Sequence, residues 1–237
     1  MDDMFNAILL GNVAGGLLVA MPEIGHTVVA LACLLLALIG RWVSARIPSL
    51  PASLPDVAIN WNPFTEAKRN LQLARTNPQV FHTLLGISWM WFFGVMFLSQ
   101  FPSFAKAVLH GDAHVASLLL VLFSVGIGIG ALMCETLSRG RVEIGLVPLG
   151  AMGMSLFAVD LHVASSQLAE APLMNIATFL SDSTHWRVMA DLLLLSLSTG
   201  LYSVPMYAWV QLHSPATECG RIMASNNIIN ALFMIAS

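Results

Sequence analysis

Polar side chains recur at helical spacing within two strongly apolar stretches, and these residues are the best suited to chemistry. The seven residues on the two faces are Ser88, Trp91, Ser99, Gln100, Asp191, Ser198 and Tyr202. Intervals of three, four, seven or eight residues place each set on one side of a helix, with Gln100 directly after the first set. Hydroxyl, carboxylate and aromatic groups together suit an amphiphilic ligand, which needs both polar and apolar contacts.

Two interpretations of these faces stay open. Strongly polar groups within an apolar helix usually face protein or a water-filled cavity, because hydrocarbon cannot satisfy them, so the faces predict the lining of a substrate pathway. Trp and Tyr also gather where a membrane meets water, and Asp191 lies near a helix end, which predicts interfacial anchoring instead. Asp160, also near a helix end, is interpreted as a solvated terminus.

Other candidate sites are weaker. His110 and His114 have the i, i+4 spacing that suits a metal on a helix, but Gly111 and Asp112 between them indicate a loop, and no third ligand is evident. The sequence shows no Ser-His-Asp arrangement, no paired catalytic carboxylates and no phosphate-binding loop. We therefore expect no metal and no cofactor, and nothing in the sequence supports an active site within this chain.

Glycines spaced four residues apart predict close helix packing. The run Gly126-Ile-Gly-Ile-Gly130 lies in the middle of an apolar stretch with no strand before it, which excludes a nucleotide-binding loop. On a membrane helix such glycines let neighbouring backbones approach closely. Gly11 and Gly15 repeat the spacing near the start of the chain.

The elements that position these residues are membrane helices. Of the 237 residues, 57% are hydrophobic and only 10% are charged, whereas soluble domains are about 25% charged. Ten basic and thirteen acidic residues cannot cover a soluble globule of this size. We expect an all-α, polytopic membrane protein. The net charge of −3 gives no support for nucleic-acid binding, so no nucleic-acid partner is expected.

Seven apolar stretches predict the spans, and most reach the roughly 20 residues that a helix needs to cross the bilayer. They cover residues 4–21, 26–46, 81–101, 114–138, 142–161, 187–212 and 222–237. The first and last are short and run directly into the chain ends. We therefore expect a fragment of a longer protein, cut at both ends.

The basic residues predict the orientation, since they are concentrated on the cytoplasmic side of membrane proteins. Eight lie on one side of the predicted spans: Arg41, Arg46, Lys68, Arg69, Arg75, Arg139, Arg141 and Arg221. Only Lys106 and Arg187 lie on the other side. The loop at residues 47–80 is accordingly predicted to be cytosolic.

This loop contains a predicted short helix. It begins with an Asn-Pro pair at 62–63 and ends with another at 77–78, and Ala67, Leu71 and Ala74 share one of its faces. An amphipathic helix on the membrane surface would place its basic residues near anionic headgroups. An ordinary connecting helix is the alternative, and the sequence does not decide between them.

A long cytosolic segment between helical spans resembles the central loop of a major facilitator superfamily transporter. Four stretches resemble its lysophospholipid-transporter branch, which includes forms fused to acyltransferase and acyl-carrier-protein-ligase domains: FPSFAKAVL at 101–109, LFSVGIGIGAL at 122–132, GRVEIGLVP at 140–148 and NNIINALF at 226–233. The resemblance implies helices five to eleven of twelve. Residues 1–46 would then be the last two helices of the N-terminal bundle, 47–80 the loop between bundles, and 81–237 a truncated C-terminal bundle.

The resemblance also implies a gate motif at the inner membrane face. The matching residues here are Gly130, Glu135, Arg139 and Arg141, with Leu132 between them. The spacing departs from the family pattern, because the carboxylate comes one position late and no basic residue directly follows it. A plain basic cytosolic loop therefore stays the alternative.

The implied function is secondary transport of lysophospholipid, or a similar amphiphile, across or between the leaflets of a bacterial inner membrane. The implied partners are the bilayer, this substrate and the missing N-terminal helices of the same polypeptide. In the family, the seventh and tenth helices line the pathway, and these are the spans with polar faces. Two alternatives remain: the membrane portion of a fused acyltransferase–ligase enzyme whose catalysis lies elsewhere, or a complete seven-helix membrane protein of other function.

Overall fold

The computed structural model describes residues 25–46, 61–138, 142–168 and 172–237. Within these ranges the chain forms eight α-helices and no strand; a single β-bridge joins Gly111 and Met174. Five of the helices are long and apolar enough to cross a membrane: α2, α4, α5, α6 and α8. The expected all-α, polytopic membrane architecture is confirmed.

The chain divides into two compact units, residues 1–57 and 58–237. In the first unit, α2 (Gly25–Ser44) matches the second expected span, and its large hydrophobic side chains are exposed, as suits a helix surrounded by lipid. At its end, the guanidinium of Arg46 lies 3.8 Å from the ring centre of Trp42. The first expected span, with Gly11 and Gly15, lies outside the described residues.

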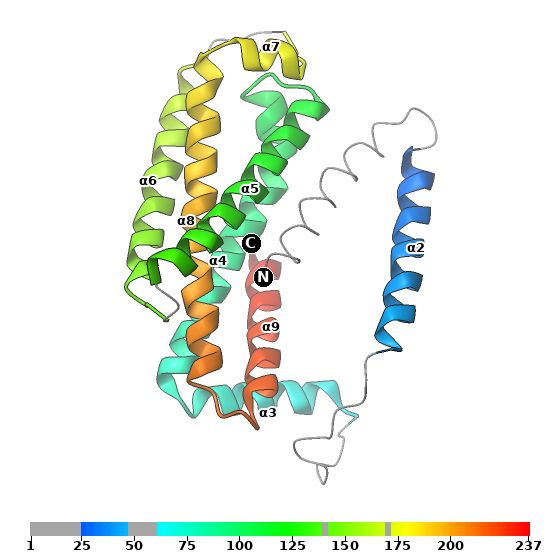
Figure 1. Ribbon diagram of the computed structural model, residues 1–237, viewed down its shortest axis with the longest axis vertical. Coiled ribbons are helices and arrows are strands. Elements are labelled where there is room, and N and C mark those ends of the chain that lie inside the picture. Colours follow the sequence, from blue (N-terminus) through cyan, green and yellow to red (C-terminus); the bar gives the residue numbers. More distant parts are fainter. Residues whose placement is uncertain (1–24, 47–60, 139–141, 169–171) are drawn as a thin grey trace. The chain divides into compact units, whose positions relative to one another are not determined.

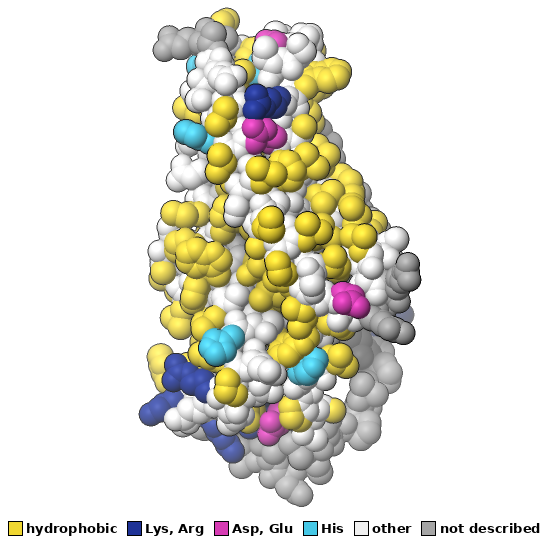
Figure 2. Space-filling view, turned by 90° about the vertical axis from the view of Figure 1, so that its left-hand side faces the viewer, with side chains coloured by type: hydrophobic (Ala, Val, Ile, Leu, Met, Phe, Trp, Pro, Cys, Tyr) yellow, Lys and Arg dark blue, Asp and Glu magenta, His cyan; other side chains and the backbone are white. Residues whose placement is uncertain are grey.

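The second unit contains the remaining helices. They are α3 (Pro63–Arg75), α4 (Pro78–Ala107), α5 (Ala113–Ser138), α6 (Leu146–Ser166), α7 (Ile176–Ser181), α8 (Thr184–Leu212) and α9 (Cys219–Ala236) (Figure 1). Figure 2 shows one face of the molecule, where hydrophobic side chains cover the middle and charged side chains gather mainly toward the ends. This distribution fits a surface that lies in a bilayer.

Several expected boundaries need correction. Helix α4 continues past Phe101 and contains Pro102, because neighbouring helices can accommodate the backbone group that a proline leaves unpaired. Helix α6 starts and ends later than residues 142–161, after the charged Glu143. The last expected span does form a helix, α9, but it is not among the five apolar helices, since Arg221 and three asparagines lower its hydropathy.

The start and end of α3 agree with the sequence signals. The Asn62 side chain accepts hydrogen bonds from the backbone N–H groups of Phe64 and Thr65, and Asn77 does the same for the start of α4. The predicted apolar face, which ends at the buried Ala74, packs on α4 and α9, and α3 lies across their ends (Figure 1). Helix α3 therefore has the contacts of a connecting helix; a membrane contact stays a prediction.

Helix α8 is the centre of the close packing, and α5 and α6 are the helices that it contacts most extensively (Figure 1). A Cβ atom on Gly130 would collide with the carbonyl oxygen of Leu197, and one on Gly126 would collide with the Ser196 hydroxyl. The packing role predicted for these glycines is confirmed. On the other side, a Cβ on Gly150 would lie only 2.7 Å from the backbone nitrogen of Tyr202.

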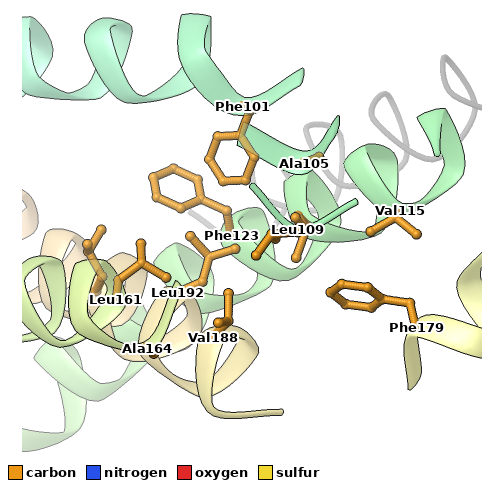
Figure 3. Packing of buried hydrophobic residues seen from close by; sticks show 12 residues of the cluster. Phe101, Ala105, Leu109, Val115, Phe123, Leu161, Ala164, Phe179, Val188 and Leu192 are labelled. Atoms are coloured by element: carbon orange, nitrogen blue, oxygen red, sulfur yellow. The ribbon is translucent and has the colours of Figure 1, made fainter. Parts of the chain in front are cut away.

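The larger hydrophobic core lies at the α7 end of the bundle. Figure 3 shows Phe101 from α4 beside Phe123 from α5, and their ring centres are 5.8 Å apart. Val188 and Leu192 add the α8 side of this core. A smaller cluster at the opposite end joins α3, α4, α8 and α9. These two clusters hold the helices that carry the predicted polar faces.

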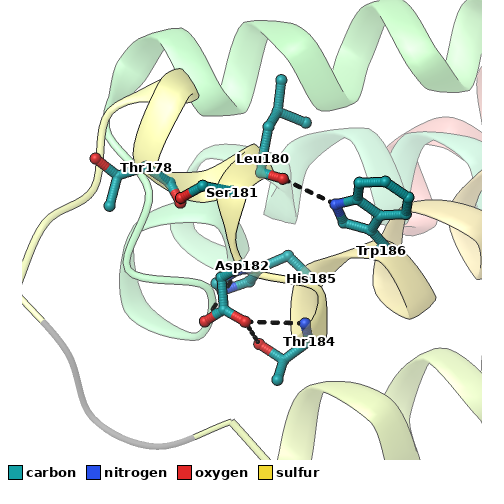
Figure 4. A network of polar contacts seen from close by, with 7 residues as sticks. All are labelled: Thr178, Leu180, Ser181, Asp182, Thr184, His185 and Trp186. Atoms are coloured by element: carbon teal, nitrogen blue, oxygen red, sulfur yellow. Dashed lines mark hydrogen bonds and ion pairs between the residues drawn. The ribbon is translucent and has the colours of Figure 1, made fainter.

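The connection into α8 contains the short helix α7, which the sequence did not predict. Asp182 accepts hydrogen bonds from the backbone N–H and the hydroxyl of Thr184, at 2.9 and 2.8 Å. The His185 ring stacks on Phe179 with 4.2 Å between ring centres, and Trp186 Nε1 donates to the Leu180 carbonyl (Figure 4). These contacts fix the start of α8 against α7.

Candidate functional site

The face predicted on α4 meets a buried polar cluster that includes residues from α9. Ser88 is fully buried; its hydroxyl donates to the Leu84 carbonyl and lies 2.7 Å from the Asn230 side-chain amide. Because the only hydroxyl hydrogen of Ser88 goes to Leu84, the amide nitrogen of Asn230 is the donor in this second contact. In that orientation the Asn230 oxygen accepts from Asn226 Nδ2 at 3.1 Å and from Trp91 Nε1 at 3.3 Å.

Trp91 connects the cluster to α8. Its Nε1 donates to the Tyr207 hydroxyl at 2.8 Å, while 38% of the residue surface stays exposed. The polar edge of the indole therefore points into the cluster and part of its ring is free for another contact. Indole rings combine a large apolar surface with one donor, which suits recognition of an amphiphile.

We call the residues of this site the amide cluster: Ser88, Trp91, Tyr207, Asn226 and Asn230. Asn226 is 1% exposed, and its Oδ1 is a buried acceptor without a hydrogen-bond partner among the described residues. Leaving such an acceptor unpaired costs about 1–3 kcal/mol. The amide cluster therefore contains a buried acceptor that would gain from a hydrogen-bond donor.

Sequence reasoning found two members of the amide cluster, Ser88 and Trp91, and missed the other three. Asn226 and Asn230 have the i, i+4 spacing of one helical face within an apolar stretch, which was an available signal. Tyr207 comes five residues after Tyr202. This interval does not place it on the predicted polar face of α8, so helical spacing gave no signal for it.

Tyr202 also bonds to α4 but has a different partner there. Its hydroxyl donates to the Gly86 carbonyl on α4 at 3.0 Å. The side chain thus bridges α4 and α8 next to the amide cluster. Ser198, 5% exposed, donates to the carbonyl of Leu194 in its own helix and packs against Gly153 of α6. The α8 face is therefore divided between two neighbouring helices.

The outer part of the polar face on α4 lies apart from the amide cluster. Ser99 is exposed, and its hydroxyl donates to the Met96 carbonyl. Gln100 lines a cleft of about 210 Å³ between α4 and α6. The other residues of this cleft are Phe97, Phe101, Phe104, Ala158, Leu161, His162 and Ser165. Its aromatic wall and few polar groups suit an apolar occupant.

Asp191 lies at a third place, in the contact between α8 and α6. It is 4% exposed, and its Oδ2 has no hydrogen-bond partner within the part of the chain that the structure describes. Next to it, Arg187 forms an ion pair with Asp160 of α6, with Nη2 and Oδ1 2.5 Å apart. Asp160 is partly exposed, as expected, but this ion pair was not predicted.

The predicted gate motif is described only in part. Gly130 is buried against α8, and Glu135 is exposed near the end of α5. Arg139 and Arg141 lie outside the described residues. The motif therefore stays a prediction.

Residues 110–112 form a loop, as expected, and His114 lies in the first turn of α5. Asp112 accepts hydrogen bonds from the backbone N–H groups of His114 and Val115 and so begins α5. Met174 N donates to the His110 carbonyl at 2.7 Å, which ties this loop to the segment before α7. Among the residues with described positions, no group of three His, Cys, Asp or Glu side chains is placed to hold a metal.

Comparison with known proteins shows similarity to a transporter. The chain is 29% identical over 211 residues to the lysophospholipid transporter LplT of Serratia proteamaculans (strain 568). The match covers 86% of this chain but 46% of that protein, so the chain spans about half the length of the relative. No protein-family model matches the chain, and no solved structure matches it. The chain is thus a multi-pass helical membrane protein with similarity to a lysophospholipid transporter.

Proposed function

We propose that this chain is part of a transporter that moves a lysophospholipid, or a similar single-chain amphiphile, across or between the leaflets of a bacterial inner membrane. Similarity to the Serratia proteamaculans transporter over 86% of the chain supports the substrate class. The five apolar helices support a membrane location. The observation that carries the proposal is the amide cluster, a group of buried polar side chains between helices that are otherwise apolar.

The chemistry of the amide cluster fits this substrate class. A lysophospholipid headgroup loses hydrogen bonds to water when it enters a membrane protein, and an unpaired polar group is costly there. The unpartnered Oδ1 of Asn226 would accept a hydrogen bond from a headgroup ammonium or hydroxyl. The exposed part of the Trp91 ring would contact the apolar portion of the molecule.

The proposed architecture is the C-terminal half of a major facilitator transporter. In this proposal α4 and α8 are the seventh and tenth helices, which line the pathway together with an N-terminal bundle, of which residues 1–46 are the last two helices. Alternating movement of the two bundles would expose the amide cluster first to one side and then to the other. Glu135, Arg139 and Arg141 would contribute to the inner gate, and residues 47–80 would form the cytosolic loop between the bundles.

Two neighbouring asparagines provide the test. Asn226 is 1% exposed and belongs to the amide cluster, whereas Asn227 is exposed. Transport of labelled lysophosphatidylethanolamine is measured in cells that express the complete polypeptide, with membrane expression measured alongside. Asn226→Ala should lower the rate about tenfold, because a hydrogen bond to a charged donor is worth roughly 1.5–3 kcal/mol. Asn227→Ala should leave the rate near that of the unchanged protein. Equal rates in both variants at equal expression would contradict the proposal.

A further inference from the structure

The contact between α6 and α8 contains charged groups that the amide cluster does not use. Asp160, Arg187 and Asp191 lie together there, and Asp191 is about 10 Å along α8 from its first residue. This carboxylate cluster holds two acidic groups and one basic group. Such groups are rare within membrane spans and usually have a function.

The basic group is already neutralised by one of the acids. Arg187 contacts both carboxylate oxygens of Asp160, through Nη2 to Oδ1 at 2.5 Å and through Nε to Oδ2 at 3.4 Å. Both side chains are partly exposed, at 50% and 38%. These two contacts pair the Arg187 guanidinium with the Asp160 carboxylate. Asp191 remains as the second acid of the cluster.

Asp191 is in a different environment from its neighbours. It is 4% exposed, and its Oδ2 is buried with no partner in the described ranges. It lies one helical turn after Arg187, on the side of α8 where Arg187 meets the Asp160 carboxylate. An ionised carboxylate that is buried, unpaired on one oxygen and beside a second carboxylate is strongly disfavoured. One added proton removes the buried charge and the repulsion between the two carboxylates, because a neutral Asp191 can donate to Asp160.

The other titratable groups of the described residues toward this end of the bundle are Lys106 on α4, His110 and Asp112 before α5, His114 on α5, His162 on α6, and Asp182 and His185 where α7 meets α8. Asp112 accepts from the backbone at the start of α5. His162 lines the cleft with α4, and His185 stacks on Phe179 and faces Asp182. Asp160 and Arg187 are the charged groups that act on Asp191.

We propose that the carboxylate cluster is a proton-binding site, in which Asp191 and Asp160 share one proton, and that its occupancy controls transport through the α6–α8 contact. The proton comes from water, adds to the Asp191 carboxylate and changes the charge of the cluster from −1 to 0. Its release returns the proton to water and leaves two carboxylates beside one guanidinium. The effect on transport rests on the proposed function; proton binding itself does not.

Infrared difference spectroscopy of the purified complete protein tests proton binding without any substrate. The unchanged protein should show the carbonyl band of a protonated carboxylic acid, which shifts in heavy water and disappears at high pH. Asp191→Asn, which keeps the shape but cannot ionise, should abolish the band. Asp182→Asn removes an exposed carboxylate near the same helix end and should leave the band unchanged. A band that persists in Asp191→Asn, or is absent from the unchanged protein, would overturn the proposal.

A bound monovalent cation is the competing occupant, and it has its own readout. If sodium raises the thermal unfolding temperature of the unchanged protein in choline buffer, and Asp191→Asn removes this effect without any protonated-acid band, the site binds a cation and the proton proposal is wrong. Transport in proteoliposomes should respond to pH in the unchanged protein and lose this response in Asp191→Asn. A normal infrared result with no lysophospholipid transport at any pH would contradict the proposed function alone.

Discussion

The two sides of α8 differ in how closely they approach their neighbours. Toward α5 and α6, glycines bring backbone against backbone: a Cβ on Gly200 would lie 2.5 Å from the Ile127 carbonyl oxygen. Toward α4 and α9, side chains make the contact. A Cβ on Gly86 would meet only the ends of the Met206 and Tyr202 side chains, which can move. We call the side of α8 that packs on α5 and α6 the frame side, because backbone meets backbone there. We call the side toward α4 and α9 the adaptable side, because polar and flexible side chains make its contacts.

Because of this difference, we expect one side of α8 to serve mainly the stability of the protein and the other to serve ligand recognition. Close backbone packing transmits force and tolerates little change, since an interior at high packing density has no room for an added methyl group. A contact made by amides, hydroxyls and an indole can exchange partners without a backbone shift. We therefore propose that ligand contact lies on the α4–α9 side of α8, and we expect substitutions on the two sides to have different consequences.

The largest expected effect is at the close-packed side. Gly130→Ala should destabilise the protein by about 3 kcal/mol, because the added methyl group meets the Leu197 backbone, which cannot move aside as a side chain can. Thermal unfolding of the purified protein measures the loss, and expression should fall with it. Gly94→Ala is the matched control, since a Cβ there has nothing within 4 Å. Equal unfolding temperatures for the two variants would remove the distinction between the two sides of α8.

A medium effect is expected from two tyrosine hydroxyls on the adaptable side. Tyr202→Phe and Tyr207→Phe each remove one hydrogen bond, to Gly86 and from Trp91 respectively, and each should cost roughly 0.5–1.5 kcal/mol of stability. Only Tyr207→Phe leaves the Trp91 indole with one acceptor fewer, so it should lower lysophospholipid transport more than Tyr202→Phe does. Stability and transport are measured on the same preparations. A larger transport loss in Tyr202→Phe would move the binding surface toward Gly86.

The sequence predicted features that depend on neighbours along the chain. The ends of α3 follow from two Asn-Pro pairs, and the packing of Gly126 and Gly130 follows from their spacing. Such signals are local, because a cap or a close helix contact needs only a few residues in register. Most helices were likewise placed to within a few residues by their apolar stretches.

Partners far apart in the chain could not be predicted in this way. Ser88 and Asn230 are 142 residues apart, and Trp91 and Tyr207 are 116 apart. Their contacts depend on which helices become neighbours, and helical spacing says nothing about that. The ion pair of Asp160 with Arg187 has the same origin. Spacing identified the polar faces as candidates, but it did not identify the partner of each side chain.

The smallest expected effect lies outside both sides of α8, at the cap where α7 meets it (Figure 4). Hydrogen bonds from the backbone N–H and the hydroxyl of Thr184 hold the pKa of the Asp182 carboxyl below its ordinary value of 3.8. A lowered folded-state pKa means that the ionised cap stabilises the protein fully above the unfolded pKa. That contribution is lost as the pH falls through the lower, folded value.

Asp182→Asn should therefore leave a weaker cap whose strength does not depend on pH. At neutral pH the variant should unfold at a slightly lower temperature than the unchanged protein, because the amide oxygen is a weaker acceptor than a carboxylate. The difference should shrink as the pH is lowered below about 4, the range in which Asp182 takes up its proton. Asp112→Asn, at the start of α5, is a useful comparison because Asp112 accepts two backbone N–H groups but no hydroxyl. An unfolding difference for Asp182→Asn that stays constant from pH 7 to acid conditions would mean that the charge of this cap does not stabilise the start of α8. In that case the position of α8 against α5 and α6 would depend on glycine packing, with no contribution from the charge at its N-terminus.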